Sequence, residues 1–275
     1  MDQVLKRQIE VATREMRREA IDMTYAMGRI GAHIGGGLSL IEIMGTLYLG
    51  VLKYDKDNMD SDQRDRVVFS KGHGTLALYT AMAQAGIIEK EDLALYKKDD
   101  SWLTAHPSLN GNIGVEFSSG SLGQGLSLAV GVSLALSRKN NQKSKIYVIL
   151  GDGECNEGSI WEAAQSASHF KCKNIVVIVD CNGLQYDGTT EEVMCESPFE
   201  DKWIAFGWDT CKIDGHDIEE IYDSLNKEHD KPLAILAKTV KGKGISFMEN
   251  NPLWHNHSLS SQQYEEALNE LGVVQ

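Results

Sequence analysis

The sequence predicts a doubly wound α/β fold, in which helices cover both faces of a mostly parallel sheet. Three runs are continuously apolar, as in strands buried on both faces, and they span residues 146–150, 175–179 and 233–236. Segments with helical character, 157–170 and 217–228, alternate with these runs. This alternation is typical of a parallel sheet whose ligands bind beyond the carboxyl ends of the strands.

Length and composition fit one globular domain. The chain has 275 residues, of which 42% are hydrophobic and 24% charged, the ordinary balance of a soluble protein. It has four prolines and shows no internal repeat and no low-complexity stretch. We therefore expect a single domain over residues 1–275.

Charge, hydropathy and cysteine usage argue against several classes of protein. The net charge of −13 is spread along the chain, which disfavours a nucleic-acid partner. The N-terminus is charged, and no run approaches the roughly 18 apolar residues of a membrane span, so we expect neither signal peptide nor anchor. Five cysteines without a Cys-x-x-Cys pair argue against zinc ribbons and secreted disulfide frameworks, which favours a cytoplasmic location.

The first half of the chain is predicted to be mainly helical. Apolar residues recur at helical spacing over 3–27. Ser39-Leu-Ile-Glu42 has the pattern of a capping box, which predicts a helix that begins directly after the glycine triplet 35–37. A short strand over 67–69 then leads into a second helix.

Residues 101–125 are predicted to form a long loop. They follow no regular period and are rich in Gly, Ser and Asn. An apolar helix to about residue 137 follows. Long loops in compact domains usually carry function, so this segment is a candidate part of a site.

A candidate metal site lies where two predicted strands end. Gly151-Asp152-Gly153 follows one strand, and Asn182 follows the next. A right-handed crossover would place the Asp152 carboxylate beside the Asn182 amide oxygen. Oxygen ligands of this kind hold Mg²⁺, often together with a diphosphate. A glycine-flanked aspartate also occurs in plain turns, so this pattern alone leaves a structural role open.

A dinucleotide site is a second interpretation of the same segment. Gly151 and Gly153 follow a strand, and the next strand ends in Asp180. The dinucleotide fingerprint needs a third glycine at the position where this chain has Asn156. It also needs an acid about 20 residues further on, and Asp180 lies further along the chain than that. The sequence therefore favours the metal site.

One central motif and five flanking motifs resemble the diphosphate-binding domain of transketolases, over nearly the whole chain. Gly151-Asp-Gly-Glu-Cys-Asn-Glu-Gly158, followed by Asn182, looks like the thiamine diphosphate motif. The flanking motifs are Gly31-Ala-His33-Ile-Gly-Gly36, Ser70-Lys-Gly-His73-Gly74, Thr104-Ala-His106-Pro107, Ser119-Gly-Ser-Leu-Gly-Gln-Gly125 and the segment from Lys241 to His255. They occur in the order that the family has.

The resemblance implies thiamine diphosphate and Mg²⁺ (or Ca²⁺) as cofactors. Asp152, Asn182 and the carbonyl of Leu184 would bind the metal, which holds the cofactor diphosphate. Histidines and glycine-freed amides are natural partners for phosphate oxygens. The residues implied to line the cofactor are His73, Gly120, Ser121, Leu122, Gly153, Asn182 and His255.

The same resemblance implies catalytic roles for three histidines. His33 and His106 would reach the sugar substrate, and together with His255 they would hydrogen-bond developing alkoxides. Histidines outside the family's motifs are interpreted as structural; they are His169, His216 and His229.

Two glutamates have two interpretations. Glu157 and Glu162 resemble the family's buried glutamates, which relay a proton between active sites. Alternatively, they stabilise a helix N-terminus through its dipole, and Ser159-x-x-Glu162 could be a capping box. The sequence leaves both interpretations open.

The resemblance implies half of an active site. A second transketolase domain supplies the glutamate that protonates the cofactor's aminopyrimidine ring, and no segment here resembles it. We therefore expect a partner, a C-terminal transketolase subunit with the pyrimidine-binding domain, in a heterotetramer with two copies of each chain. The implied reaction moves a two-carbon ketol unit from a ketose (phosphate) to an aldose. The alternatives are the α subunit of a split 2-oxo acid dehydrogenase and a non-catalytic nucleotide-binding module.

The chain departs from the family's pattern after Trp254-His255. Most transketolases continue Gly-Lys-Ala-Pro, whereas this chain reads Asn256-His257-Ser258-Leu259. The difference is either neutral drift in a surface loop or a shifted substrate preference, since groups beside a substrate hydroxyl alter discrimination.

Overall fold

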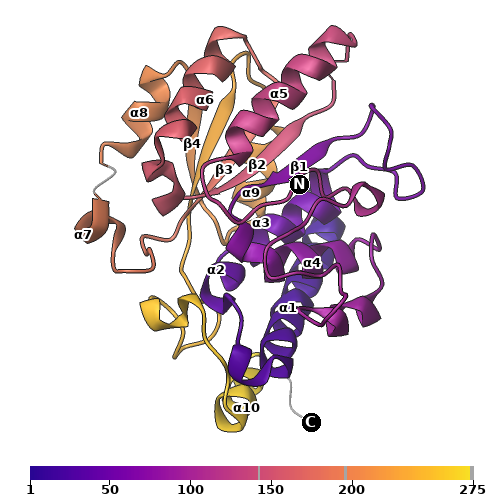
Figure 1. Ribbon diagram of the computed structural model, residues 1–275, viewed down its shortest axis with the longest axis vertical. Helices are drawn as coiled ribbons and strands as arrows, with labels where there is room; N and C mark the ends of the chain where they lie inside the picture. The colour runs from indigo at the N-terminus through magenta and orange to yellow at the C-terminus, as the bar shows by residue number, and fades with distance from the viewer. Residues whose placement is uncertain (142, 195–196, 273–275) are drawn as a thin grey trace.

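The computed structural model describes residues 1–141, 143–194 and 197–272. At its centre lies a five-stranded sheet of order β1-β2-β3-β5-β4, in which all neighbouring strands are parallel (Figure 1). This confirms the predicted α/β class. The strands are β1 (Arg66–Phe69), β2 (Ile146–Gly151), β3 (Ile175–Cys181), β4 (Asp209–Asp214) and β5 (Leu233–Lys238). The helices are α1 (Gln3–Ala26), α2 (Ile34–Leu38), α3 (Ile41–Thr46), α4 (Thr75–Gln84), α5 (Gly125–Arg138), α6 (Gly158–His169), α7 (Thr190–Met194), α8 (Phe199–Ala205), α9 (Ile218–Asn226) and α10 (Ser261–Glu270).

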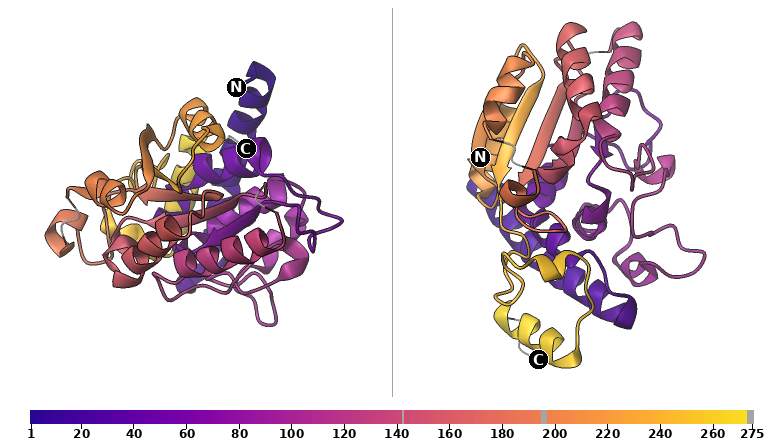
Figure 2. Two further views of the ribbon diagram at one scale, coloured as in Figure 1. Left: turned by 90° about the horizontal axis from the view of Figure 1, so that it is seen from above. Right: turned by 60° about the vertical axis from the view of Figure 1, so that its left-hand side comes forward.

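Helices cover both faces of the sheet, as Figure 2 shows from two further directions. On one face Ile146, Val148 and Leu150 of β2 pack with residues of α5, α6 and α8. On the other, Tyr147 and Ile149 pack with residues of α1, α3, α4 and α9. Burial on both faces explains why the sequence of this strand is apolar without alternation.

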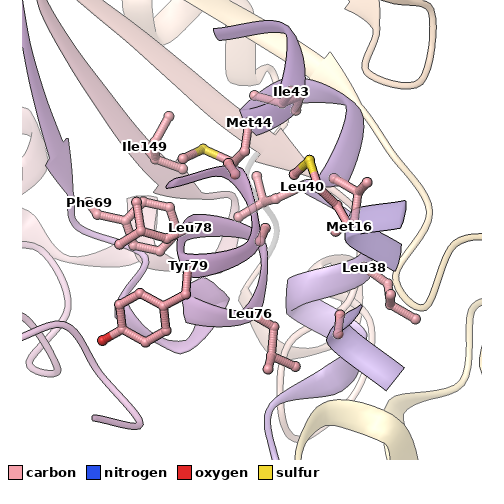
Figure 3. Packing of buried hydrophobic residues seen from close by; sticks show 14 of the residues in the cluster. Met16, Leu38, Leu40, Ile43, Met44, Phe69, Leu76, Leu78, Tyr79 and Ile149 are labelled. Carbon is pink, nitrogen blue, oxygen red and sulfur yellow. The ribbon is translucent and has the colours of Figure 1, made fainter. Parts of the chain in front are cut away.

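Helix α4 forms part of the core beneath the candidate site. Its residues from Thr75 to Ala83 are all buried. Figure 3 shows Leu78 and Tyr79 of this helix in one packed cluster with Phe69 of β1. Because close-packed cores move little, the turn that leads into α4 is held firmly, and this turn carries His73.

The structure corrects the helix start predicted at Ser39. The glycine triplet 35–37 lies inside α2, and α3 begins only at Ile41. Ser39 Oγ does not cap the helix but donates to Asp180 Oδ2 at 2.5 Å. Glu42, the other half of the expected capping box, is held in a buried ion pair. Tertiary hydrogen bonds have thus taken both side chains away from the local motif.

The elements that the sequence pattern missed are polar, short or late in the chain. β4 is an edge strand of half-buried and exposed residues, so it shows no apolar run. α7 and α8 have five and seven residues. α10 begins at a capping box of Ser260 and Gln263, a spacing visible in the sequence. Within the described residues, no helix is both long and apolar enough to cross a membrane.

Candidate active site beside the carboxyl ends of the strands

Four histidines from distant parts of the chain lie together. His33 precedes α2 and His73 lies in the turn before α4. His106 belongs to the long loop, and His255 ends the turn Pro252–His255. The ring centroid of His33 is 5.2 Å from that of His106 and 5.5 Å from that of His255, while His73 and His255 are 5.2 Å apart. The structure therefore brings together the histidines that the resemblance singled out.

Glycines allow this close approach. A Cβ on Gly36 would lie 2.9 Å from Cδ2 of His73. A Cβ on Gly72 would lie 2.6 Å from Oγ of Ser119, beside the loop that carries Gly120. Both distances are shorter than real side-chain contacts, so these glycine motifs are a packing requirement of the site.

Burial favours the neutral form of all four rings. Burial lowers the pKa of His33 to about 4, and burial together with the charge of Lys241 lowers the pKa of His255 to about 3. Burial also lowers the pKa values of His73 and His106. A neutral imidazole offers one donor and one acceptor. Nδ1 of His33 is buried and has no partner among the described residues, so it is available to a ligand.

The candidate metal-binding side chains of Asp152 and Asn182 directly follow the neighbouring strands β2 and β3, as predicted. Asp152 Oδ2 accepts a hydrogen bond from the Gly183 N–H at 2.6 Å, and its Oδ1 accepts one from the Gly153 N–H at 2.8 Å. Asn182 Oδ1 accepts the Leu184 N–H at 3.1 Å. Asp152 and Asn182 are only 6% and 8% exposed. The crossover connection has therefore brought the carboxylate into contact with the loop that carries the amide.

The groups present fit a divalent cation and a diphosphate. A carboxylate, an amide oxygen and a backbone carbonyl are the ligands that Mg²⁺ and Ca²⁺ take. Burial raises the pKa of Asp152 to about 6, and a bound cation would favour the ionised form. Gln185 Nε2 and Ser119 Oγ are buried and have no partner within the described part of the chain. Gln185 lies beside Gly153 and Ser119 lies beside Gly72, so both donors suit an anionic ligand.

Two buried lysines at the site were not singled out from the sequence. Lys241 Nζ donates to the Leu184 carbonyl at 3.2 Å and lies 3.1 Å from His255 Nδ1. Burial, aided by the charge of Lys71, lowers the pKa of Lys241 to about 8, so it remains positive at pH 7. Lys71 forms a buried ion pair with Asp180. Each lysine stands beside glycine in a family motif, which was the available signal.

Glu154 is a further buried group that the sequence analysis did not assign. It is 2% exposed. Its carboxylate accepts hydrogen bonds from the Gly123 N–H at 2.9 Å, from the Gly151 N–H at 3.1 Å and from Ser70 Oγ. Glu154 therefore joins the loop after Gly120 to the loop that carries Asp152.

The segment expected to line the cofactor lies at the same edge. A Cβ on Gly120 would lie 3.8 Å from the ring of His106. A Cβ on Gly153 would lie 2.8 Å from a side chain of the metal loop. Ser121 is exposed and Leu122 half-buried, so both are open to a ligand.

Comparison with known proteins identifies the family. Residues 10–274 match the family model described as transketolase, thiamine diphosphate binding domain. The chain belongs to the transketolase family. It is 40% identical over 266 residues to a subunit of the apulose-4-phosphate transketolase of Actinobacillus succinogenes, covering 96% of both chains. It is also 40% identical over 249 residues to the 6-deoxy-6-sulfo-D-fructose transketolase subunit SqwG of a Clostridium species, covering 89% of this chain and 90% of the relative.

Solved transketolases share the fold. The enzyme from Campylobacter jejuni superposes with a TM-score of 0.87 at 30% sequence identity. The superposition covers 99% of this chain but 43% of the solved one. The chain therefore spans less than half the length of that transketolase.

This transketolase chain does not bring Glu157 and Glu162 into the histidine cluster. Both side chains are exposed. Ser159 Oγ donates to the Gly123 carbonyl at 2.8 Å, and the helix start has no side-chain cap, so the capping-box interpretation is wrong. The proton-relay role stays a prediction, and the exposure of both glutamates leaves them accessible to a second chain.

Residues 256–259 help to place the segment that carries His33. His257 and Ala32 exchange two backbone hydrogen bonds of 3.1 Å. Leu259 is 6% exposed and packs into the core. Part of this departure from the transketolase pattern is therefore structural, and its effect on substrate preference stays a prediction.

Burial and hydrogen bonding bear on two further hypotheses, the dinucleotide site and the structural role of His216. Asp180 has no exposed surface and is paired with Lys71, so its carboxylate is not accessible to a ribose, and the dinucleotide interpretation is wrong. His216 Nδ1 lies 2.9 Å from Glu42 Oε2, and its Nε2 accepts the Val240 N–H at 2.9 Å. Both of its ring nitrogens are used inside the fold, which agrees with the structural role expected for this histidine.

Proposed function

We propose that this chain is the diphosphate-binding subunit of a two-chain transketolase that transfers a two-carbon ketol unit from a ketose to an aldose. The observation that carries the proposal is a cluster of four histidines that Lys241 connects to the loop of Asn182. Lys241 Nζ donates to the Leu184 carbonyl and lies 3.1 Å from His255 Nδ1. The chain also matches transketolase subunits over nearly their whole length, which favours this function over that of a 2-oxo acid dehydrogenase. Bound thiamine diphosphate would supply the nucleophilic carbon that amino-acid side chains lack.

One group of residues binds the cofactor diphosphate. Asp152, Asn182 and the Leu184 carbonyl hold Mg²⁺ or Ca²⁺, which neutralises the diphosphate. Lys241 adds a positive charge beside the same loop. His73 lies against Gly36 of the glycine triplet and offers an N–H to a phosphate oxygen. This arrangement leaves the remaining histidines free for the sugar.

The substrate side is formed by His33, His106 and His255. Their neutral rings can donate to or accept from sugar hydroxyls, and each can hold a proton at an oxygen where negative charge develops. The two relatives above are named for apulose-4-phosphate and for 6-deoxy-6-sulfo-D-fructose. We therefore propose a sugar phosphate or a related anionic sugar as substrate.

A second chain completes the enzyme. We propose that residues 1–275 form one thiamine diphosphate-binding domain, and that a C-terminal transketolase subunit supplies the pyrimidine-binding domain. Relatives that are named as subunits support a partner. Two copies of each chain and a cytoplasmic location complete the proposal, the latter on the cysteine pattern of the sequence.

The proposed function predicts that the chain alone lacks ketol transfer. It contributes the residues that bind the diphosphate and the histidines of the site, while the acid for the aminopyrimidine ring comes from the partner. We expect turnover of a ketose phosphate with an aldose phosphate only when chain and partner are mixed with thiamine diphosphate and Mg²⁺. Full turnover by the single chain would contradict the two-chain proposal, and no turnover by the mixture would contradict the proposed reaction.

Replacing Lys241 by methionine should weaken thiamine diphosphate binding. A hydrogen bond to a charged group contributes about 1.5–3 kcal/mol, which corresponds to a roughly 10- to 100-fold change in Kd. Calorimetric titration of the assembled protein measures this change. Lys243→Met is the matched control, because Lys243 pairs with Glu249 at 3.5 Å instead of facing the metal loop. Equal Kd values for both variants would remove Lys241 from the site.

A further inference from the structure

Asp180 is a buried carboxylate that touches the candidate cation site without being part of it. It lies in β3 and has no exposed surface. Its carboxylate accepts hydrogen bonds from Ser39 Oγ at 2.5 Å and from Asn182 Nδ2 at 3.3 Å. It also accepts hydrogen bonds from Lys71 Nζ and Thr239 Oγ1. Four side chains from separate segments therefore converge on one group.

Each of these donors is close in sequence to a residue of the candidate site. The Asp180 carboxylate is therefore hydrogen-bonded to each of the segments that carry these site residues. Ser39 follows His33, Lys71 precedes His73, Thr239 precedes Lys241, and Asn182 is itself a candidate metal ligand.

Two hydrogen bonds fix the orientation of the Asn182 amide, one at its nitrogen and one at its oxygen. Because Nδ2 donates to the Asp180 carboxylate, Oδ1 is directed to the other side, where it accepts the Leu184 N–H at 3.1 Å. Only the oxygen end of an amide can bind a cation, since the NH₂ group is a donor. An ionised carboxylate only accepts hydrogen bonds, so Asp180 enforces this orientation together with the Leu184 N–H.

Asp180 also contacts the other candidate ligand through its backbone. Its carbonyl accepts the Asp152 N–H at 3.2 Å. In the sheet, Asp180 is paired with Gly151, the residue that precedes Asp152. Asp180 is therefore hydrogen-bonded to both candidate metal ligands. Its main-chain carbonyl binds Asp152, and its side chain binds Asn182.

We propose that Asp180 is a positioning residue, which holds the Asn182 amide with its oxygen toward the divalent cation. The proposal rests on the proposed function, because the cation is the one that would hold the cofactor diphosphate. In Asp180→Asn the new amide would offer both a donor and an acceptor to Asn182, so only the hydrogen bond from the Leu184 N–H would still favour this orientation.

The test measures cation binding directly in the assembled protein. Mn²⁺ is titrated in the presence of thiamine diphosphate and followed by electron paramagnetic resonance, which counts bound metal without turnover. We expect Asp180→Asn to weaken Mn²⁺ binding at least tenfold, in the range typical of groups that orient metal ligands. Asp65→Asn is the matched control, because Asp65 is also buried (3% exposed) but lies outside the site, and it should bind Mn²⁺ as the wild type does.

A second variant separates positioning from charge balance. Asp180→Asn alone leaves the buried ammonium of Lys71 without its counter-ion, which is destabilising. The double variant Asp180→Asn with Lys71→Met removes that charge, so we expect Tm to recover toward the wild-type value. The tenfold loss of Mn²⁺ affinity should persist in this stable protein. Recovery of wild-type Mn²⁺ affinity in the double variant would overturn the proposal, because Asp180 would then act only as a counter-ion.

A double-mutant cycle tests whether Asp180 acts through Asn182. In an Asn182→Ala background, Asp180→Asn should change Mn²⁺ affinity less than twofold. A further tenfold loss there would overturn the proposed route. If the wild-type assembly bound no Mn²⁺ with thiamine diphosphate, both this inference and the proposed cation site would fall. Unchanged Mn²⁺ affinity in Asp180→Asn alone would overturn the inference and leave the proposed function standing.

Discussion

Replacing Asp152 by alanine should abolish tight, Mg²⁺-dependent binding of thiamine diphosphate. The carboxylate is the only charged group among the three proposed metal ligands. Loss even of groups that merely orient metal ligands weakens binding by about 10- to 100-fold, so loss of the charged ligand should cost roughly 100-fold or more. Asn182→Ala removes a neutral ligand and should have a smaller effect.

The experiment has to separate binding from folding, because Asp152 is buried. Its carboxylate accepts the Gly153 and Gly183 amides, and leaving such donors unpaired costs about 1–3 kcal/mol each. Asp152→Asn keeps an oxygen acceptor at this position and removes the charge. Calorimetric titration of the assembled protein, with thermal unfolding measured in parallel, should therefore show weak binding in both variants and a larger loss of stability in Asp152→Ala. The exposed Asp230→Ala is the control.

Two outcomes would contradict the assignment. One is binding of thiamine diphosphate with unchanged Mg²⁺ dependence by Asp152→Ala and Asn182→Ala. The other is a loss of binding in Asp152→Ala that is matched entirely by unfolding, while Asp152→Asn binds normally. In either case the oxygen ligands would have to be sought elsewhere along this edge of the sheet.

The motifs that resemble those of transketolases were sufficient to predict which residues in glycine-rich connections the fold brings together. His33, His73 and His255 lie in motifs whose glycines permit close approach, and Asp152 and Asn182 follow strongly apolar strands. Both kinds of signal are local. A local pattern remains readable without knowledge of how distant segments pack.

The buried charges could not be predicted in the same way, because their partners are distant. Lys71 and Asp180 are 109 residues apart, and Ser70 and Glu154 are 84 apart. In the sequence, Asp180 was interpreted only as a possible ribose ligand, since its burial depends on the tertiary fold. The failure of the Ser39 capping box has the same cause: a distant acceptor competes with the local one.

Glu154 connects two loops of the site, so its removal should affect stability and local order together. Glu154→Ala leaves the Gly123 and Gly151 amides and the Ser70 hydroxyl without their acceptor. At about 1–3 kcal/mol for each unpaired buried group, we expect a loss of about 3 kcal/mol or more. For a domain of this size, about 2–4 °C per kcal/mol gives a Tm lower by roughly 6–12 °C.

The distinguishing measurement is hydrogen exchange, because a general loss of stability would not select these two loops. We expect faster exchange in peptides 119–125 and 151–158 of Glu154→Ala under conditions where the sheet remains protected, since these segments contain the two backbone amides, of Gly123 and Gly151, that donate to Glu154. Glu154→Gln keeps one acceptor oxygen and should fall between alanine and wild type. Glu266→Ala, an exposed substitution on α10, should leave Tm and exchange unchanged. If Glu154→Ala behaved like Glu266→Ala, the three hydrogen bonds would contribute no net free energy, and the loop after Gly120 would have to be held by Ser159 and the packing of α5 instead.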